Sequence, residues 1–490
     1  MARSFDEEAP YPGGDNLNEK CGVIGVRVRG ADVDVARIAY FGLYALQHRG
    51  QESAGIAVGD GHTVVCHREM GLIGAIFDEE ILSRLSGYVA CGHTRYSTTG
   101  SSLVVNAQPL LENSPLGDFA LAHNGNLTNT EQLRALLPPD LRLQVESDSD
   151  VMAKLLALEP GSDFVERIQS LMRRMEGSYS IVMATADQLI AFRDPWGIRP
   201  LCIGRLGDGW VVASESCALA TVGAEYVREI EPGEIVCIDD AGLRSARSEV
   251  VRKPSFCVFE YIYFSRPDSI MAGRSIYIAR HAMGRQLAKE HPADADVVMA
   301  VPDSAVPGGI GYADESGLPY VEGLIKNRYI GRTFISPDQS MRARGVKLKF
   351  NPLVENLRGK RVVVVDDSIV RGTTTRNIVR LIRDAGAVEV HVRITSPPMI
   401  HPCFLGVDTA SYDELIAANK TVEEIREHIG ADSLGYLGLK GLLASTGRPP
   451  SDFCTGCLSG RYPEVIAEHV EGDGRIVSKP EPALSASRTH

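Results

Sequence analysis

The sequence predicts two domains of different fold class, an α+β domain over residues 21–250 and an α/β domain with a parallel sheet over residues 251–470. The first observation is length, because 490 residues exceed what one hydrophobic core usually organises. The second is a change near residue 250 from many short β-type runs to helical stretches that alternate with continuous apolar runs. A Glu-Pro-Gly-Glu turn at 231–234 and a basic, proline-containing segment at 252–254 mark the boundary.

The first domain combines short β-type runs with two stretches of helical periodicity. The β-type runs are Gly22–Val28, Gly55–Val58, Thr63–Cys66, Ser180–Ala184, Gly209–Ala213 and Glu234–Ile238. Helical periodicity covers Val33–Leu46 and Ser149–Leu158. This mixture favours helices layered on sheets.

In the second domain, two helical stretches accompany three strands. The helical stretches are Tyr277–Glu290 and Thr374–Ala385. Val297–Val301 and Val362–Val365 are continuous apolar runs, which indicates strands of a parallel sheet that is buried on both faces. Val388–Ile394 alternates apolar and polar residues, so we expect it nearer an edge of the sheet. The polar tail over 471–490 is expected to be disordered.

Composition describes a soluble, acidic protein. Hydrophobic residues make up 44% and charged residues 23%, and the net charge is −12. The acidic balance argues against nucleic acid or an anionic membrane surface as the partner. Residues 1–20 lack the apolar segment of a secretory signal, and no apolar run is long enough to cross a membrane. The ten cysteines are spread along the chain, so we expect a cytoplasmic enzyme that acts on small molecules.

One segment of the second domain has the features of a phosphate site. Residues 362–375 read VVVVDDSIVRGTTT, which places two acids at the end of a buried strand and a loop of small residues at the start of a helix. Ligands of parallel sheets bind at that end. The loop's N–H groups suit a phosphate monoester, and the acids suit ribose hydroxyls or Mg²⁺. An isolated Asp-Asp pair would more often be a turn, but the whole pattern favours a ligand site.

This segment resembles the signature of type I phosphoribosyltransferases, which bind phosphoribosylpyrophosphate (PRPP). The resemblance implies that 301–304 faces the diphosphate and that 326–329 begins a flap that closes over PRPP. The residues implied to bind PRPP are Ser304, Lys326, Asp366, Asp367, Ser368, Arg371, Gly372, Thr373 and Thr374. Those implied to hold Mg²⁺ are Ser304, Asp366 and Asp367. The basic residues of the flap region are Lys326, Arg328, Arg332, Arg342, Arg344, Lys347 and Lys349, and pyrophosphate release needs such charge.

Cys21 opens the first strand, directly after an acidic leader over residues 1–20. A single cysteine there would most often be a core residue. It is accompanied by the segments His48–Gly55, Gly92–Ser97, Asn106–Pro109 and His123–Leu127. Together they resemble class II glutamine amidotransferases, whose fold is an N-terminal-nucleophile glutaminase domain with αββα layers.

The resemblance implies a role for each member of this group. Removal of the leader would free the α-amine of Cys21, whose pKa of about 8 suits a base for the residue's own thiol. The thiolate would attack glutamine, release ammonia and leave a thioester that water hydrolyses to glutamate. Asn124 and the N–H of Gly125 would form the oxyanion hole. Arg95 would bind the substrate carboxylate and Asp148 its α-amine.

Two histidines in these segments, His48 and His93, are expected to be structural.

Four other cysteines stand in a pattern of their own. They are Cys257, Cys403, Cys454 and Cys457. They resemble the ligands of a [4Fe-4S] subgroup that also carries a leader. Zinc suits four thiolates equally well, and disulfides are a further alternative.

Both halves together resemble the family of glutamine phosphoribosylpyrophosphate amidotransferases. The implied reaction is glutamine, PRPP and water giving 5-phosphoribosylamine, glutamate and pyrophosphate, the committed step of de novo purine synthesis. Ammonia would travel through a dry channel that flap closure builds, which couples the two sites. The resemblance also implies purine nucleotides as feedback inhibitors and a homotetramer.

Three other interpretations compete. Glucosamine-6-phosphate synthase shares the glutaminase half but lacks the PRPP signature. A non-catalytic PRPP-sensing regulator would be expected to lack the nucleophile, the oxyanion pair or Arg95, and all are present. A metal-binding scaffold with structural cysteines would leave the glutaminase residues unexplained.

Overall fold

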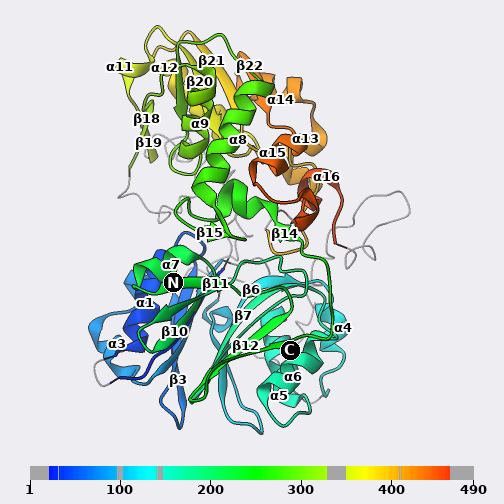
Figure 1. The fold of residues 1–490 in the computed structure, drawn as a ribbon. Coiled ribbons are helices and arrows are strands. Elements are labelled where there is room, and N and C mark those ends of the chain that lie inside the picture. Colours follow the sequence, from blue (N-terminus) through cyan, green and yellow to red (C-terminus); the bar gives the residue numbers. More distant parts are fainter. Residues whose placement is uncertain are drawn as a thin grey trace, which may run out of the picture.

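The chain folds into two domains that lie one above the other in Figure 1. The computed structural model describes residues 21–30, 33–96, 103–139, 141, 147–327, 349–407, 409 and 411–463. The expected leader, most of the expected flap and the expected tail lie outside these residues. The first domain holds the blue to green part of the chain, and the second the green to red part.

The N-terminal domain contains two antiparallel sheets. The seven-stranded sheet, in spatial order, consists of β11 (Glu225–Glu229), β9 (Cys202–Leu206), β10 (Gly209–Ala213), β1 (Gly22–Arg27), β4 (Val89–Arg95), β2 (Ser53–Gly59) and β3 (Val64–Met70). The six-stranded sheet consists of β13 (Gly242–Arg247), β12 (Glu234–Asp239), β8 (Leu189–Arg193), β7 (Gly177–Thr185), β6 (Phe119–Leu127) and β5 (Leu110–Glu112).

The two sheets face each other across an apolar core, because successive side chains of a strand point to opposite faces. Val23, Val182 and Val212 belong to this inner layer. The sheets approach closely at Gly25, where a Cβ atom would lie 2.6 Å from side-chain carbons of Val182 and Leu189. Glycine is therefore required at this point of β1.

Helices cover the outer face of each sheet (Figure 1). The seven-stranded sheet packs against α1 (Val35–Ala45), α2 (Ile73–Ile76), α3 (Glu79–Arg84) and α7 (Ser216–Thr221). The six-stranded sheet packs against α4 (Thr130–Arg134), α5 (Asp148–Leu158) and α6 (Phe164–Met172). The sequence determines where α1 begins, since Asp34 accepts a hydrogen bond from the Arg37 N–H at 2.9 Å. The order of layers is αββα, which confirms the predicted fold class.

The C-terminal domain is built on a parallel sheet. Its four strands, in spatial order, are β17 (Val297–Ala300), β20 (Arg361–Asp366), β21 (Glu389–Ile394) and β22 (Ser433–Tyr436). One face packs against α8 (Ile276–Glu290), α9 (Val306–Ser316) and α15 (Leu439–Ser445). The other face packs against α12 (Thr373–Asp384) and α14 (Val422–Ile429). The continuous apolar runs correctly predicted a sheet that is covered on both faces.

The expectation that Val388–Ile394 lies near an edge is wrong, because β21 pairs with β20 on one side and β22 on the other. Its polar residues find partners inside the domain. The buried guanidinium of Arg393 donates to the backbone oxygens of His291 and Pro292. His391 lies 2.9 Å from the hydroxyl of Ser433. The buried Arg393 is therefore satisfied by hydrogen bonds inside the domain, whereas Glu389 and His391 stay partly exposed.

Short elements complete the two domains, η1 in the N-terminal domain and the others in the C-terminal domain. They are η1 (Val104–Asn106), β14 (Phe256–Cys257), η2 (Glu260–Phe264), β15 (Ile270–Met271), β16 (Arg274–Ser275), β18 (Leu324–Lys326), β19 (Phe350–Pro352), α11 (Val354–Leu357), η3 (Tyr412–Glu414), α13 (Ile416–Asn419), η4 (Pro450–Asp452), β23 (Phe453–Cys454) and α16 (Gly456–Ser459). Strands β14 and β23 pair in parallel, so segments about two hundred residues apart meet beside the first domain.

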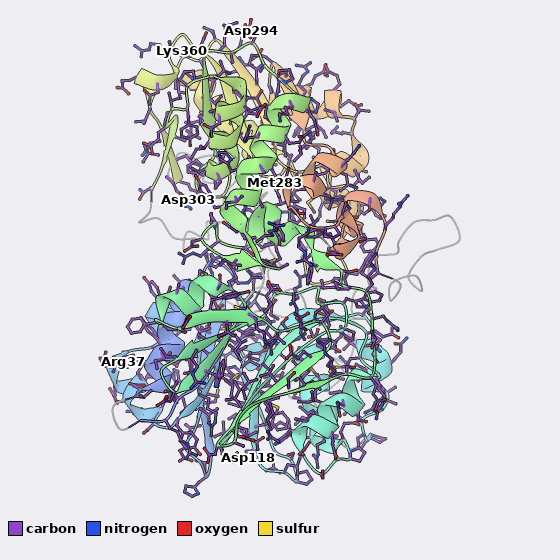
Figure 2. All side chains as sticks on the ribbon, viewed as in Figure 1. Arg37, Asp118, Met283, Asp294, Asp303 and Lys360 are labelled. Atoms are coloured by element: carbon purple, nitrogen blue, oxygen red, sulfur yellow. The ribbon has the colours of Figure 1, made fainter. Side chains whose placement is uncertain are left out.

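The parallel sheet points its carboxyl ends at the N-terminal domain. Asp294 and Lys360, which precede β17 and β20, lie at the far end of the molecule in Figure 2. Asp303, which follows β17, lies on the side near the first domain. The ligand-binding end of the sheet therefore faces the domain that holds Cys21. Within the described part of the chain, no helix is long and apolar enough to cross a membrane.

His93 makes the N-terminal domain sensitive to acid. Its side chain is fully buried in β4, and this burial lowers the pKa of the imidazole to about 3. A histidine in an unfolded chain has a pKa of about 6.5. The stabilisation from keeping His93 neutral is therefore complete above about pH 6.5 and is lost as the pH falls toward about 3.

We expect the thermal midpoint of unfolding, measured by calorimetry, to fall between about pH 8 and about pH 5. The fall should be smaller in His93→Gln, because this variant takes up no proton at the position on unfolding. His62→Gln, at an exposed histidine, is the matched control and should keep the original pH dependence. Identical pH dependence in the two variants would contradict the assignment to His93.

Candidate functional site

A cavity of about 440 Å³ lies where the two domains meet. The first domain contributes His48, Arg49 and Gln51 to its wall. Of the residues predicted to bind PRPP, those that line the cavity are Ser304, Lys326, Asp366, Asp367, Ser368, Gly372 and Thr374. The cavity is therefore shared between the phosphoribosyltransferase-like loops and the segment that follows α1.

The two acids at the end of β20 form the polar floor of this cavity. Asp367 accepts hydrogen bonds from the hydroxyls of Ser304 at 2.5 Å and Ser368 at 2.8 Å. Asp366 accepts from the Asp367 N–H at 2.9 Å. Burial raises the pKa of both carboxyls, and for Asp366 the negative charge of Asp367 raises it further. The pair therefore favours a nearby cation, which would relieve the repulsion.

These residues suit Mg²⁺. The structure shows no group of three or more His, Cys, Asp or Glu side chains among the described residues that could hold a metal ion. Mg²⁺ does not require such a group, because it is usually bound through one or two carboxylates together with substrate phosphates and water. Two adjacent buried carboxylates beside the Ser304 hydroxyl match that pattern.

The loop that follows the acids turns into α12. Gly372 has φ of 82°, a left-handed conformation that favours glycine, and it precedes the first residue of the helix. Its neighbour Arg371 does not line the cavity but pairs with Glu414 at 2.6 Å. Thr373, also predicted to bind PRPP, does not line the cavity, whereas the unpredicted Thr375 does. The loop thus presents its glycine and its later threonines to the cavity.

Two basic side chains from opposite ends of the expected flap reach the cavity. Lys326 in β18 pairs with Asp303 at 2.5 Å. Lys349 stands next to β19 and also lines the cavity. Because β18 and β19 pair, they bring the two ends of the segment together. The remaining basic residues of the flap, Arg328, Arg332, Arg342, Arg344 and Lys347, lie outside the described residues.

Cys21 is partly buried and directly precedes β1. Its thiol is directed to the backbone oxygen of Tyr96 at 3.6 Å, and its own backbone oxygen accepts from Nε of Arg49 at 3.2 Å. Burial raises the pKa of the Cys21 thiol, whereas the bond to Tyr96 and the charge of Arg95 act in the opposite direction. Removing the thiol proton at neutral pH therefore needs a nearby base.

The predicted oxyanion residues lie in β6. The Asn124 side chain is buried, and its Nδ2 has no hydrogen-bond partner among the described residues. A buried unsatisfied donor is costly unless a ligand accepts its hydrogen bond. At Gly125 a Cβ atom would lie 2.0 Å from the backbone oxygen of Ser178, so only glycine fits. The amide of Asn124 is thus a donor that a substrate oxygen would satisfy.

The two charged residues expected to bind glutamine are both close enough to influence the Cys21 thiol. Arg95, at the end of β4, is paired with Glu52 at 3.0 Å. Asp148, at the start of α5, accepts from the N–H of Leu127 at 3.0 Å, which connects it to the end of β6. The structure therefore brings Cys21, Arg95 and Asp148 together, with Glu52 as an acid that the sequence pattern did not single out.

The four cysteines predicted to hold a cluster converge at the junction. Cys257 and Cys454 are opposite each other in the paired strands β14 and β23. Cys457 follows in α16, and its backbone oxygen accepts from the N–H of His401 at 3.1 Å, which draws in the segment of Cys403. Burial raises the pKa of the Cys457 thiol, and the other three cysteines raise it further. The four sulfurs thus lie near one another in the apolar core of the C-terminal domain.

By their chemistry, four thiolates suit either a four-iron cluster or a zinc ion. Among the described residues, no group of three or more His, Cys, Asp or Glu side chains is arranged to hold a metal ion. Arg199 supports a negatively charged centre, because its fully buried guanidinium lowers the pKa of the Cys257 and Cys403 thiols against the effect of burial.

The sequence pattern missed several residues that join the two sites. His48 was expected to be structural, yet it lines the cavity and lies 2.8 Å from Glu215. Arg280 in α8 lines the cavity and lowers the pKa of Asp367 by its charge, against the effect of burial. Of these three residues, only His48 falls within a segment, His48–Gly55, that the sequence analysis assigned to the glutaminase-like group. Glu215 and Arg280 stand in unremarkable sequence, and only the fold brings them to the site.

Comparison with protein families matches each domain separately. Residues 93–221 match the glutamine amidotransferase domain, and residues 268–395 match the phosphoribosyl transferase domain. The first match includes Arg95 and the oxyanion residues of β6, and the second includes Ser304, Lys326 and the acid pair.

Whole-chain relatives agree with this combination. An amidophosphoribosyltransferase of Synechococcus elongatus is 53% identical over 93% of this chain and 94% of its own length. That of Mycobacterium tuberculosis is 50% identical over 91% of this chain and 86% of its own length. Among solved structures, glutamine PRPP amidotransferase from B. subtilis, complexed with ADP and GMP, has a TM-score of 0.85 and 47% identity, and the match covers 90% of this chain and 97% of that one.

These sequences are about half identical to this chain over nearly the full length of each protein compared. Such similarity indicates common ancestry and not a chance likeness of folds. The chain belongs to the amidophosphoribosyltransferase family, the enzymes of the first step of purine biosynthesis.

Proposed function

We propose that this chain converts glutamine, PRPP and water into 5-phosphoribosylamine, glutamate and pyrophosphate. The observation that carries this proposal is the shared cavity. Its floor is the acid pair Asp366 and Asp367, and its wall includes Arg49, whose Nε donates to the backbone oxygen of Cys21. The side chain of Arg49 thus spans the distance between the nucleophile for glutamine and the proposed PRPP site.

The glutaminase half-reaction begins at Cys21. After removal of residues 1–20, the freed α-amine accepts the thiol proton. A base is needed here because burial raises the pKa of the Cys21 thiol. The sulfur attacks the carboxamide carbon of glutamine, and the C–N bond breaks as ammonia leaves with the transferred proton. Water then hydrolyses the thioester to glutamate and restores the thiol.

Three residues position the glutamine. The Nδ2 of Asn124 and the backbone N–H of Gly125 donate to the oxyanion, and a donor of this kind contributes about 3 kcal/mol in comparable sites. Arg95 holds the substrate's carboxylate, and Asp148 holds its α-amine. The partly exposed Asp148 keeps acceptor capacity beyond its bond to Leu127, because a carboxylate has about four acceptor positions.

In the second half-reaction ammonia displaces pyrophosphate at C1 of the ribose. Asp366 and Asp367 hold the ribose hydroxyls, and the loop through Gly372 and Thr374 holds the 5-phosphate. When bound at Ser304, Asp366 and Asp367, Mg²⁺ would neutralise the diphosphate as the C1–O bond breaks. Lys326 draws the leaving pyrophosphate by its charge. Ammonia reaches C1 through the junction, where exclusion of water keeps it unprotonated.

The four clustered cysteines, Cys257, Cys403, Cys454 and Cys457, would hold a [4Fe-4S] cluster that ties β14 and β23 to the loop after β21. The cluster's chemistry is structural in this proposal, since thiolate coordination links three segments of chain. Purine nucleotides would inhibit by binding the anion-binding cavity. The B. subtilis relative complexed with ADP and GMP supports this part of the proposal. A cytoplasmic homotetramer is the expected form.

Cys21→Ala should abolish the glutamine-dependent reaction by at least about a thousandfold, because no other group forms the thioester. Synthesis from PRPP and added ammonia should stay within about twofold of the unmodified protein, since the second site is intact. Pyrophosphate release measures both reactions. Cys66→Ala, at a partly buried cysteine of the same domain, is the control and should retain both. Full glutamine-dependent turnover in Cys21→Ala would refute the nucleophile assignment.

Asp366→Asn should lower both the glutamine-dependent and the ammonia-dependent reaction by about a hundredfold, because it removes charge at the ribose and Mg²⁺ site. Hydrolysis of glutamine in the absence of PRPP should persist. Asp384→Asn, at the exposed end of α12, is the matched control and should change neither reaction. If Asp366→Asn left the ammonia-dependent reaction intact, the acid pair would not be part of the PRPP site.

Anaerobic purification should give an intact mass that lacks residues 1–20 and about four irons per chain. Cys457→Ser should lose most of the iron, because it removes one thiolate from the set. Cys237→Ser, at a buried cysteine of the N-terminal domain, should keep it. Zinc in place of iron would overturn the cluster assignment, and a full-length mass would overturn the proposed processing.

A further inference from the structure

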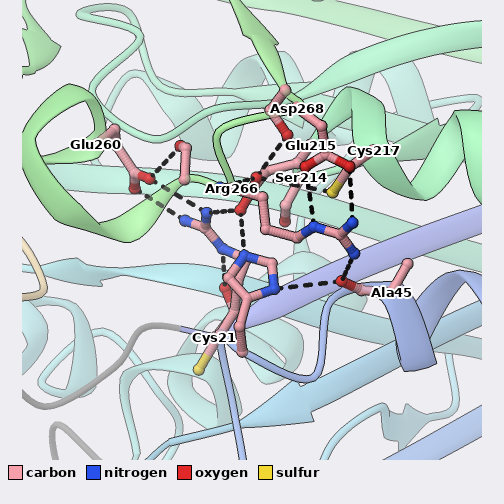
Figure 3. Close-up of polar contacts among 12 residues, drawn as sticks. Cys21, Ala45, Ser214, Glu215, Cys217, Glu260, Arg266 and Asp268 are labelled. Atoms are coloured by element: carbon pink, nitrogen blue, oxygen red, sulfur yellow. Dashed lines mark hydrogen bonds and ion pairs between the residues drawn. The ribbon is translucent and has the colours of Figure 1, made fainter. Parts of the chain in front are cut away.

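A buried group of charges connects Cys21 to the C-terminal domain. We call Arg49, Glu215 and Glu260 the bridging cluster; each side chain is 1% exposed. Arg49 contacts Glu215 through Nη1 and Glu260 through Nη1 at 3.1 Å and Nη2 at 2.8 Å. Its Nε donates to the backbone oxygen of Cys21. Figure 3 shows Glu215, Glu260 and Cys21 gathered around this group of polar contacts.

Glu215 takes partners from both domains. From its own domain it contacts His48 at 2.8 Å and Arg49. From the C-terminal domain it accepts from the Arg266 N–H at 2.9 Å and from the Ser269 hydroxyl at 2.7 Å. Burial raises the pKa of Glu215, but the charges and hydrogen bonds of these partners outweigh it and hold the pKa well below its usual range. The ionised carboxylate is therefore satisfied by groups from both sides of the junction.

Glu260 continues the connection to the phosphoribosyl site. Its Oε2 accepts from the Ser265 hydroxyl at 2.9 Å, and the Ser265 backbone oxygen accepts from Arg280 at 2.7 Å. Arg280 lines the cavity and acts by its charge on Asp367. Hydrogen bonds thus run from Arg280 through Ser265, Glu260 and Arg49 to the backbone of the nucleophile, and the charge of Arg280 links this series to Asp367.

Such a cluster resists partial displacement. Moving the segment that carries Ser265 and Ser269 would leave a buried carboxylate without its donors, and an unpaired buried charge is strongly unfavourable. The segment therefore moves together with Arg49 or stays in place. Since Arg49 holds the backbone oxygen of Cys21, a shift at the cavity wall reaches the nucleophile's backbone.

We propose that Glu215 is the positioning residue that couples occupation of the PRPP site to the glutaminase site, through Arg49 and the backbone of Cys21. This inference rests on the proposed function and deepens it. Glu215 itself lines no part of the cavity and contacts neither Asp366 nor the Cys21 thiol. Its role is to keep the segment over 265–269 in register with Arg49.

The test uses the processed enzyme, without residues 1–20, and measures three quantities: glutamate formed from glutamine without PRPP, glutamate formed with PRPP and Mg²⁺, and pyrophosphate released with ammonia. In Glu215→Gln, the factor by which PRPP raises glutamine hydrolysis should fall by at least about tenfold, within the range of typical coupling between sites. The ammonia-dependent rate should stay within about twofold of the unmodified protein.

Ser269→Ala is the milder variant, because it removes one donor from Glu215 and leaves the charges paired. It should lower the PRPP effect in the same direction by a smaller factor. Glu234→Gln is the matched control. Glu234 is also buried, but it pairs with Arg228 inside the N-terminal domain, so its variant should keep the PRPP effect even if its thermal midpoint falls.

The outcomes separate the inference from the proposed function. Absence of phosphoribosylamine synthesis in the unmodified protein would refute the function. Synthesis with no effect of PRPP on glutamine hydrolysis would refute the coupling. If Ser269→Ala kept the full PRPP effect, or if Glu215→Gln lowered all three rates in proportion to a loss of folded protein, the cluster would be only structural and the inference would be wrong.

Discussion

The buried guanidinium of Arg49 is the constraint around which the junction is organised. One side chain satisfies two carboxylates and the backbone of the nucleophile, so α1, the turn before α7 and the π-helical turn η2 must meet at one point. Burying these charges is favourable only when every one is paired. The relative position of the two domains is therefore determined by hydrogen-bond geometry as well as by apolar contact.

The sequence predicted the elements whose patterns are local. The run Val362–Val365 and the acids after it located β20 and the cavity floor, because a strand buried on both faces needs a continuous apolar run. Likewise, the segments that accompany Cys21 indicated a glutaminase domain, and the αββα layers of the N-terminal domain agree with that fold class. Strand and helix boundaries differ by a few residues, since hydrogen bonding extends an element beyond its apolar part.

What the sequence could not predict depends on contacts between distant residues. The polar alternation of β21 suggested an edge, yet Arg393 is buried because the turn after α8 supplies carbonyl acceptors. Glu215 stands in a segment without a motif and Glu260 stands three residues after Cys257, but nothing local shows that both meet Arg49. Arg371 belongs to the expected phosphate loop by position but is turned away toward Glu414. In each case the position of the side chain depends on a hydrogen-bonding or charged partner that is distant in the sequence, and not on the residues next to it in the chain.

The charge balance of the cavity explains why its two ends should respond to each other. Asp366 and Asp367 are buried acids whose pKa values are raised, so a cation that arrives with the diphosphate changes the field at the floor of the cavity. Arg280 faces that field on one side and holds the backbone of Ser265 on the other. Binding therefore alters the balance of a charge that is already part of the connection to Cys21. In the proposed coupling, the groups between the two sites are buried and little screened by solvent, so a change of charge at the floor of the cavity would act on Arg280 and its partners.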